Sequence, residues 1–272
     1  MPVTERYLAT YHNHTRYSDG KATIAEMVAA AEEAGIDELG ISDHLTLAPW
    51  GRVNWGMDPA RLVEYVEEIE AARMRSTISI RLGLEVDWFE GQAETIAETL
   101  GEAPFDYLIG SVHFAGKFSI DGSATGWKAL SEGERTSMHR EYWRLIGGLA
   151  ESGLFDVVGH LDLSKKFGFF PPVVELQAEI DLALDAVASA GMVVELNTAG
   201  WHKPCGEAYP TRDLLQRCRE RGILATLSSD AHQPEHLTRD FDRGLQVLEE
   251  AGYDRIARFT GRQTSTFPLR AS

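Results

Sequence analysis

Histidine is concentrated at a few points of the chain, where acidic residues stand close by. Six of the nine histidines belong to such motifs, and two further acidic residues, Asp19 and Glu85, lie near them. Imidazole nitrogens and carboxylate oxygens together suit Zn, Mn or Fe. The candidate metal ligands are therefore His12, His14, Asp19, His44, Glu85, His113, His160, Asp230 and His232.

The number of these candidates exceeds what one zinc ion needs, because a tetrahedral zinc site takes about four ligands. The set fits two or three divalent ions, with a carboxylate such as Glu85 bridging two of them. Side chains two residues apart in a strand point the same way, so His12 and His14 can grip one ion, as can Asp230 and His232. The set contains no thiolate, which argues against a purely structural zinc site.

Strand patterns precede most of these motifs. Short apolar stretches alternate with amphipathic helical patterns along the chain. We expect strands at 7–11, 38–42, 79–86, 107–112, 157–159, 192–196 and 223–228. We expect helices at 24–34, 59–75, 92–100, 134–151, 173–190, 211–221 and 234–251. A last extended piece, 258–267, is expected to pair at an edge or to close the structure, and 114–133 is a Gly- and Ser-rich insertion.

Strands that alternate with helices predict right-handed crossovers and a parallel sheet. The carboxyl ends of parallel strands lie on one rim, and in α/β barrels that rim holds the active site. An open sheet would spread seven strand ends along a line, whereas a barrel gathers them around one centre. We therefore predict an α/β fold with a seven-stranded, TIM-like (β/α)7 barrel and a single domain over residues 1–272.

Composition excludes several other classes of protein. The formal net charge is −16, which disfavours nucleic acids and anionic membranes as partners. There is no apolar run of about 18 residues that would span a bilayer. Cys205 and Cys218 form neither a disulfide framework nor a CxxC pair, which favours a reducing, cytoplasmic location. A homo-oligomer is possible, but nothing in the sequence indicates one.

The motifs as a set resemble the polymerase and histidinol phosphatase (PHP) superfamily, and they occur in the right order from residue 12 to residue 232. The matching motifs are His12-x-His14 with Ser18-Asp19-Gly20, Asp43-His44, Gly-Leu-Glu85, Gly-Ser-Val-His113, Gly-His160-Leu-Asp and Ser-Asp230-Ala-His232. The resemblance implies a distorted seven-stranded (β/α) barrel with a trinuclear metal centre.

The resemblance also implies how the ligands divide among three ions. His12 and His14 would hold one ion with Glu85 and Asp230. Glu85 would bridge to a second ion, which His113 and His160 also hold. The third ion would be held by Asp19, His44 and His232, although some relatives have histidine where this chain has Asp19.

Two stretches, GHLDLSKKFG and ELNTAGWHKPCGEAYP, resemble the histidinol-phosphate phosphatase branch of this superfamily. That branch usually has Leu-Arg where this chain has Trp201-His202, and the arginine stands where a phosphate contact is expected. The resemblance implies hydrolysis of L-histidinol phosphate to L-histidinol and phosphate, a step of histidine biosynthesis. The substrate-binding candidates are Asn197, Trp201, His202, Lys203 and Lys166.

Hydrolysis of a phosphomonoester needs a nucleophile, neutralisation of charge and a proton for the leaving group. Paired divalent ions supply a hydroxide near neutral pH and clamp the phosphoryl oxygens, so we expect attack by a metal-bridging hydroxide. Glu85, Asp230 and His232 are the catalytic candidates. The cation that neutralises the phosphoryl oxygens would be Lys203, or else Lys165 or Lys166.

Four acidic residues stand next to ligands in the sequence and have two open interpretations. They could orient the imidazoles by accepting hydrogen bonds, or they could attract the cationic amine of a substrate. The four residues are Asp43, Asp87, Asp162 and Glu195.

Three alternative functions remain open. The nearest is a PHP phosphoesterase acting on nucleotides, oligonucleotide ends or other small phosphomonoesters. A second is a non-catalytic, metal-bound module. The presence of a ligand-type residue at all nine positions argues against it. A third is an amidohydrolase acting on C–N bonds, to which the motif set is a poor fit.

Overall fold

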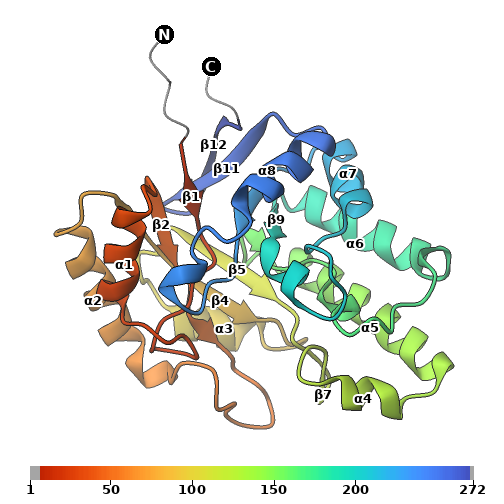
Figure 1. The fold of residues 1–272 in the computed structure, drawn as a ribbon. Coiled ribbons are helices and arrows are strands. Elements are labelled where there is room, and N and C mark those ends of the chain that lie inside the picture. The colour runs from red at the N-terminus through yellow and green to blue at the C-terminus, as the bar shows by residue number, and fades with distance from the viewer. Residues whose placement is uncertain (1–6, 270–272) are drawn as a thin grey trace.

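Seven parallel strands form the centre of the protein, which the computed structural model describes over residues 7–269 (Figure 1). In sheet order they are β1 (Ala9–Thr10), β2 (Glu38–Ile41), β4 (Ser79–Asp87), β5 (Tyr107–Ser111), β8 (Val157–Val158), β9 (Val193–Asn197) and β10 (Ala225–Ser228). A short strand, β3 (His44–Leu45), pairs with β4 beyond the end of β2. Beyond β1 and β10, a parallel bridge joins Asn13 to Ala231, so the sheet is a nearly closed barrel, as predicted.

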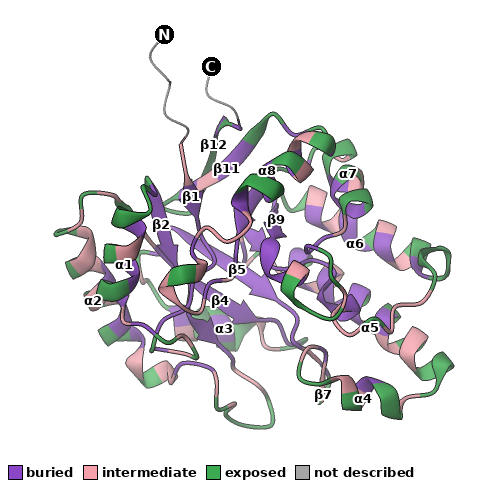
Figure 2. Cartoon of the chain, in the orientation of Figure 1, coloured by how far each residue is buried: buried purple, intermediate pink, exposed green. Residues whose placement is uncertain are grey.

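Helices cover the outside of this sheet. They are α1 (Ile24–Glu33), α2 (Leu62–Arg73), α3 (Ala93–Leu100), α5 (Glu132–Glu151), α6 (Gln177–Ser189), α7 (Arg212–Glu220) and α8 (Phe241–Glu250). Figure 2 shows buried strands at the centre and helices whose exposed faces turn outward. Helix α5 begins two residues earlier than predicted because Ser131 caps it, while the Glu134 carboxylate accepts from the Ser131 backbone N–H at 2.8 Å.

Three of the predicted helices are divided in the structure. Short 3-10 turns precede α2, α6 and α8, at Pro59–Arg61, Val173–Leu176 and Pro234–His236. Before α8 the break is complete, because Asp240 has a left-handed φ of 60° and starts the helix anew. Two more 3-10 turns, Leu163–Lys165 and Thr198–His202, follow β8 and β9 at the rim.

The insertion after β5 contains regular structure that the sequence did not predict. A small antiparallel hairpin, β6 (Phe114–Ala115) with β7 (Phe118–Ser119), is followed by helix α4 (Ala124–Ala129). Lys166 binds this insertion, since its ammonium donates to the backbone carbonyl of Asp121 at 2.9 Å and to the Asp121 carboxylate at 3.1 Å. The insertion is therefore fixed over the rim by a residue that follows β8.

The C-terminal segment forms a hairpin of two antiparallel strands, β11 (Arg255–Thr260) and β12 (Gln263–Pro268), instead of one extended piece. Of the two predicted alternatives, it closes the structure and does not pair with a barrel edge. Phe259 packs edge-on against Tyr11 with ring centres 5.0 Å apart, and Arg258 binds the buried Glu38 carboxylate at 2.7 Å. These contacts seal the amino-terminal end of the barrel, opposite the rim.

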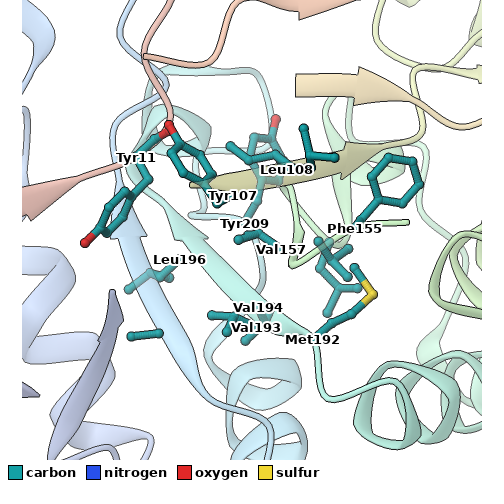
Figure 3. Packing of buried hydrophobic residues seen from close by; sticks show 14 of the residues in the cluster. Tyr11, Tyr107, Leu108, Phe155, Val157, Met192, Val193, Val194, Leu196 and Tyr209 are labelled. Atoms are coloured by element: carbon teal, nitrogen blue, oxygen red, sulfur yellow. The ribbon is translucent and has the colours of Figure 1, made fainter. Parts of the chain in front are cut away.

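Aromatic side chains fill the barrel interior above this seal. Tyr11 and Tyr107 lie side by side there (Figure 3), with ring centres 5.4 Å apart. Tyr107 fits only because two strand residues opposite it are glycines: a Cβ at Gly83 would lie 2.3 Å from the Tyr107 ring, and one at Gly40 would lie 2.3 Å from its hydroxyl. The floor of the rim site is thus a packed aromatic layer.

Within residues 7–269, no helix has the length and apolar character needed to span a bilayer.

Candidate metal centre

All nine predicted ligands lie together at the carboxyl-terminal rim of the barrel. Their donor atoms form overlapping groups in which every atom lies within 4.8 Å of the others. The groups are His14, Asp19, His44 and His232; His12, Glu85 and His160; His12, His14 and Asp230; and His44, Glu85 and His113. Residues more than two hundred positions apart in the chain therefore share one site.

Glu85, near the end of β4, lies at the centre of this arrangement. Its carboxylate is 2.7 Å from Nδ1 of His44, 2.9 Å from Nε2 of His160 and 3.1 Å from Nε2 of His12. It is also 3.6 Å from Nε2 of His113. A carboxylate that is buried and reaches imidazoles on four other segments has the position that a bridging ligand requires.

The two other acidic ligands lie on the open side of the site. Asp230 is 3.2 Å from Nε2 of His14, and Asp19 is 3.2 Å from Nε2 of His232. Asp19 and His232 are each about one-third exposed, whereas His14 is fully buried. This side of the centre therefore faces solvent and is accessible to a ligand.

The groups of donor atoms share members across the expected division among three ions. His14 lies with Asp19, His44 and His232, because its ring is 4.2 Å from those of both His44 and His232. Glu85 approaches His44 as well as His113. Residues expected at different ions therefore lie within reach of one another.

Several buried polar atoms in this cluster lack a hydrogen-bond partner. They include Nε2 of His12, Nε2 of His14 and Oε2 of Glu85. Buried polar atoms without a partner are costly and uncommon in folded proteins. Bound cations would satisfy these lone pairs, so the donor set fits divalent metal ions.

Electrostatics place two of the ligands in their metal-binding protonation states, whereas, against the effect of burial, neighbouring carboxylates raise the pKa of His12, of His113 to about 10 and of His232 to about 9. Burial alone would raise the pKa of the Glu85 carboxyl, but the imidazoles of His44 and His12 hold it well below its ordinary value. Burial and the neighbouring His44 and His232 lower the pKa of His14 to about 3. Glu85 is therefore ionised and His14 neutral at physiological pH, as metal coordination requires.

Two of the four accompanying acidic residues orient imidazoles. Nδ1 of His12 donates to Glu195 at 2.7 Å, and Nδ1 of His113 donates to Asp87 at 2.9 Å. Each bond fixes the tautomer and leaves Nε2 free to face the centre.

The other two acidic residues have different roles. The carboxylate of Asp43 accepts from the hydroxyls of Thr15 and Ser18 at 2.7 and 2.5 Å, and so holds the turn that leads to Asp19. Asp162 binds Lys165 at 3.0 Å and the backbone N–H of Thr211. Neither contacts an imidazole of the centre in the described structure.

Two ligands have unusual backbone conformations. His160 has a φ of 26° and Asp230 a φ of 51°, both in the left-handed region that most residues avoid. Both follow the ends of strands, where the chain turns back over the rim. Such strained residues cluster at functional sites, and here the strain accompanies side chains that face the shared centre.

A cavity of about 510 Å³ opens above the ligands. Six of the nine ligands line it: Asp19, His44, His113, His160, Asp230 and His232. Lys166 and Lys203, two of the predicted substrate-binding residues, also line it. The cavity therefore joins the metal-binding side chains to a wall that carries positive charge.

The other three predicted substrate-binding residues do not line this cavity. Asn197 lies below it, where its amide donates to Glu195 at 3.1 Å. The ring of Trp201 lies under Arg243, 4.0 Å from the guanidinium carbon. His202 is about half exposed and binds Asp240 at 2.6 Å.

One wall of the cavity is formed by a residue that was not among the predicted site residues. Trp55 lines it, with its ring 4.6 Å from that of His44 and 5.5 Å from that of His113. Trp55 belongs to a loop without periodic pattern, so nothing in the sequence marked it. Only the packing of that loop over the rim brings the indole to the site.

Comparison with known proteins places the chain in a family. Residues 10–199 match the PHP domain. The chain is also 38% identical to a probable histidinol-phosphatase of Deinococcus radiodurans, across 90% of this chain and 94% of that protein. The chain belongs to the PHP domain family. Another relative of this PHP protein is the histidinol-phosphatase of Bacillus subtilis, which is 27% identical across 82% of this chain and 92% of its own length.

A solved structure shows that this PHP protein shares the fold of that family. The histidinol phosphate phosphatase of Lactococcus lactis, crystallised with Zn, L-histidinol and phosphate, superposes with a TM-score of 0.80. The match covers 95% of this chain and 98% of that one at 22% identity. The barrel described above is therefore the PHP barrel.

Proposed function

We propose that this PHP protein is a histidinol-phosphatase, which converts L-histidinol phosphate and water into L-histidinol and phosphate in histidine biosynthesis. The observation that carries the proposal is the convergence of nine imidazole and carboxylate side chains on one centre, six of which line the cavity above it. The relatives that match over most of the chain support this choice of substrate.

We further propose that the nine ligands hold two to three divalent ions, with Glu85 as the bridge. Zinc is the first candidate because the related Lactococcus lactis enzyme was crystallised with it, and the same donor set suits Mn and Fe. When bound, such ions activate water and neutralise charge on the phosphoryl oxygens. In this proposal Glu85, Asp230 and His232 are the residues nearest the chemistry.

The protein's own residues hold this site in place before substrate arrives. Glu195 and Asp87 fix the rings of His12 and His113, and Asn197 in turn binds Glu195. Because these contacts are buried, the ligand geometry is set by the folded barrel and needs no rearrangement at the moment of reaction.

The cavity wall suits a substrate with a phosphate at one end and a cationic amine at the other. Lys203 lines the cavity and has an exposed side chain, so its ammonium is available to phosphoryl oxygens. The carboxylate of Asp121, which is paired with Lys166, is also on the wall and can attract the amine of histidinol phosphate. Free Cys205 and Cys218 agree with a cytoplasmic location, which we include in the proposal.

Phosphate release across a panel of substrates tests this function. Histidinol phosphate, nucleoside monophosphates and sugar phosphates should each be assayed with protein loaded with Zn, Mn or Fe. We expect histidinol phosphate to have the highest kcat/KM with at least one metal. Hydrolysis of nucleotides with histidinol phosphate left intact would contradict the proposal and favour a nucleotide phosphoesterase, and inertness toward all substrates would favour a non-catalytic module.

A further inference from the structure

Four cationic side chains line the cavity, and they differ in whether each already has a hydrogen-bond or ion-pair partner. Lys21 donates to the side chain of Gln233 at 2.8 Å, and Lys166 is paired with Asp121. Lys203 is exposed. The remaining cation, Arg239, differs from all three because part of its guanidinium is buried and unsatisfied.

Arg239 has no carboxylate partner within residues 7–269. Its Nη1 approaches only the ring nitrogens of His236, at 3.4 and 3.5 Å, and its buried Nε has no hydrogen-bond partner. Burial, and then the Arg239 guanidinium, lower the pKa of His236, so this imidazole is neutral. A guanidinium with a buried N–H left free next to a cavity has unused capacity to bind an anion.

Two contacts fix the backbone that carries this arginine. The hydroxyl of Thr198 donates to the carbonyl of Arg239 at 2.7 Å, and His202 binds the carboxylate of the next residue, Asp240, at 2.6 Å. Asp240 is the left-handed residue at which the chain turns into α8. The loop after β9 therefore holds the turn from which the Arg239 side chain reaches the cavity.

We propose that Arg239 is a substrate-binding residue that clamps the phosphate group against the metal centre. The inference rests on the proposed function and deepens it. A planar guanidinium suits phosphate because it donates two parallel N–H bonds, which an ammonium cannot do. In a chain of net charge −16, a local cation at the mouth is also what an anionic group needs to approach.

His202 has a supporting part in this proposal. It does not line the cavity but binds Asp240, so in this proposal it holds the turn that carries Arg239.

Three variants test the role of Arg239. Arg239→Gln removes the charge, Arg239→Lys keeps the charge but not the paired N–H groups, and Arg212→Gln is the control. Arg212 binds Glu250 on the outer surface and is 58% exposed, away from the cavity. Each variant is compared with wild type for bound metal, for kcat and KM on histidinol phosphate, and for binding of inorganic phosphate to the metal-loaded protein by calorimetry.

We expect Arg239→Gln to raise KM and to weaken the binding of inorganic phosphate by at least about tenfold, the scale of one charge-assisted contact. Metal content should be unchanged, Arg239→Lys should fall in between, and Arg212→Gln should match wild type. Phosphate affinity within about twofold of wild type in Arg239→Gln would overturn the proposal. So would a loss of phosphate affinity that is accompanied by a matching loss of bound metal. The phosphate measurement decides this even if histidinol phosphate proves not to be the substrate.

Discussion

At the scale of single residues, Glu85 is central to the site, because its buried carboxylate lies within 3.6 Å of imidazoles on four other segments of the chain. It is buried at the end of β4 and ionised, although burial by itself favours its neutral form. Only compensation by the surrounding imidazoles, or by bound cations, makes such a charge tolerable in the interior.

We predict that Glu85→Ala releases bound metal and lowers turnover by more than about a hundredfold, beyond the cost of losing an outer contact to a ligand. The variant should keep the circular dichroism spectrum of the folded barrel. Elemental analysis and phosphate release measure the two effects, with Glu90→Ala as control, since Glu90 is exposed and pairs with Arg144. Retained activity with a full metal content in Glu85→Ala would show that the bridging role is wrong.

His139 is a residue whose titration affects folding and not the site. It is buried in α5, its Nε2 donates to the carbonyl of Phe169 at 3.1 Å, and it stacks on Trp127. Burial lowers its pKa from 6.5 to about 4 despite that hydrogen bond. The unfolded chain therefore binds a proton in the window between these values that the folded protein does not.

The free energy of unfolding should consequently fall as pH drops from 6.5 toward 4, because the unfolded state takes up more protons there. We predict that His139 accounts for up to about 3 kcal/mol of this loss. Urea unfolding of wild type and His139→Phe at several pH values measures it as a difference in slope. Parallel pH profiles for the two proteins would contradict the prediction.

At the scale of elements, the sequence predicted the positions of all seven barrel strands and the side chains that follow them. The reason is physical, since strand periodicity and ligand type are local properties. The breaks before α2, α6 and α8 were missed, because helical periodicity continues across them. At Asp240 the left-handed turn is held by a contact with His202, a partner far away in the chain.

Packing inside the barrel gives a prediction at this scale. Gly83→Ala in β4 would place a Cβ 2.3 Å from the Tyr107 ring, and the ring cannot move freely in a filled core. We expect a loss of about 1–3 kcal/mol in the free energy of unfolding, measured by urea denaturation. Gly133→Ala in α5, where a Cβ meets nothing within 4 Å, should be neutral or stabilising. Equal stability of the two variants would contradict this view of the core.

At the scale of the whole molecule, the site exists only because the barrel closes. A bridge joins Asn13 to Ala231, and the His14 N–H donates to the Ala231 carbonyl at 2.8 Å. These contacts bring the ligands at the start of the chain next to those that follow β10. Parallel topology let the sequence predict this convergence. It did not predict Trp55 or Arg239, because loop conformation and side-chain direction at the rim depend on long-range contacts.

Ions held between the two ends of a closed barrel would stabilise the folded protein. We predict that a chelator lowers the melting temperature by about 5–10 °C, because ions that bind only the folded state stabilise it by mass action. Differential scanning fluorimetry measures the shift, and added Zn or Mn should reverse it. Glu85→Ala is the control, since a protein that has already lost its ions should respond little to the chelator. An unchanged wild-type melting temperature would count against a metal centre that supports the fold.

The most direct test of the central claim is anomalous diffraction at metal absorption edges from crystals of the metal-loaded protein. The account predicts two or three peaks at the carboxyl-terminal rim, each coordinated by members of the nine-residue set, with Glu85 between two of them. Absence of ordered ions at that rim, or peaks bound by other residues, would contradict it.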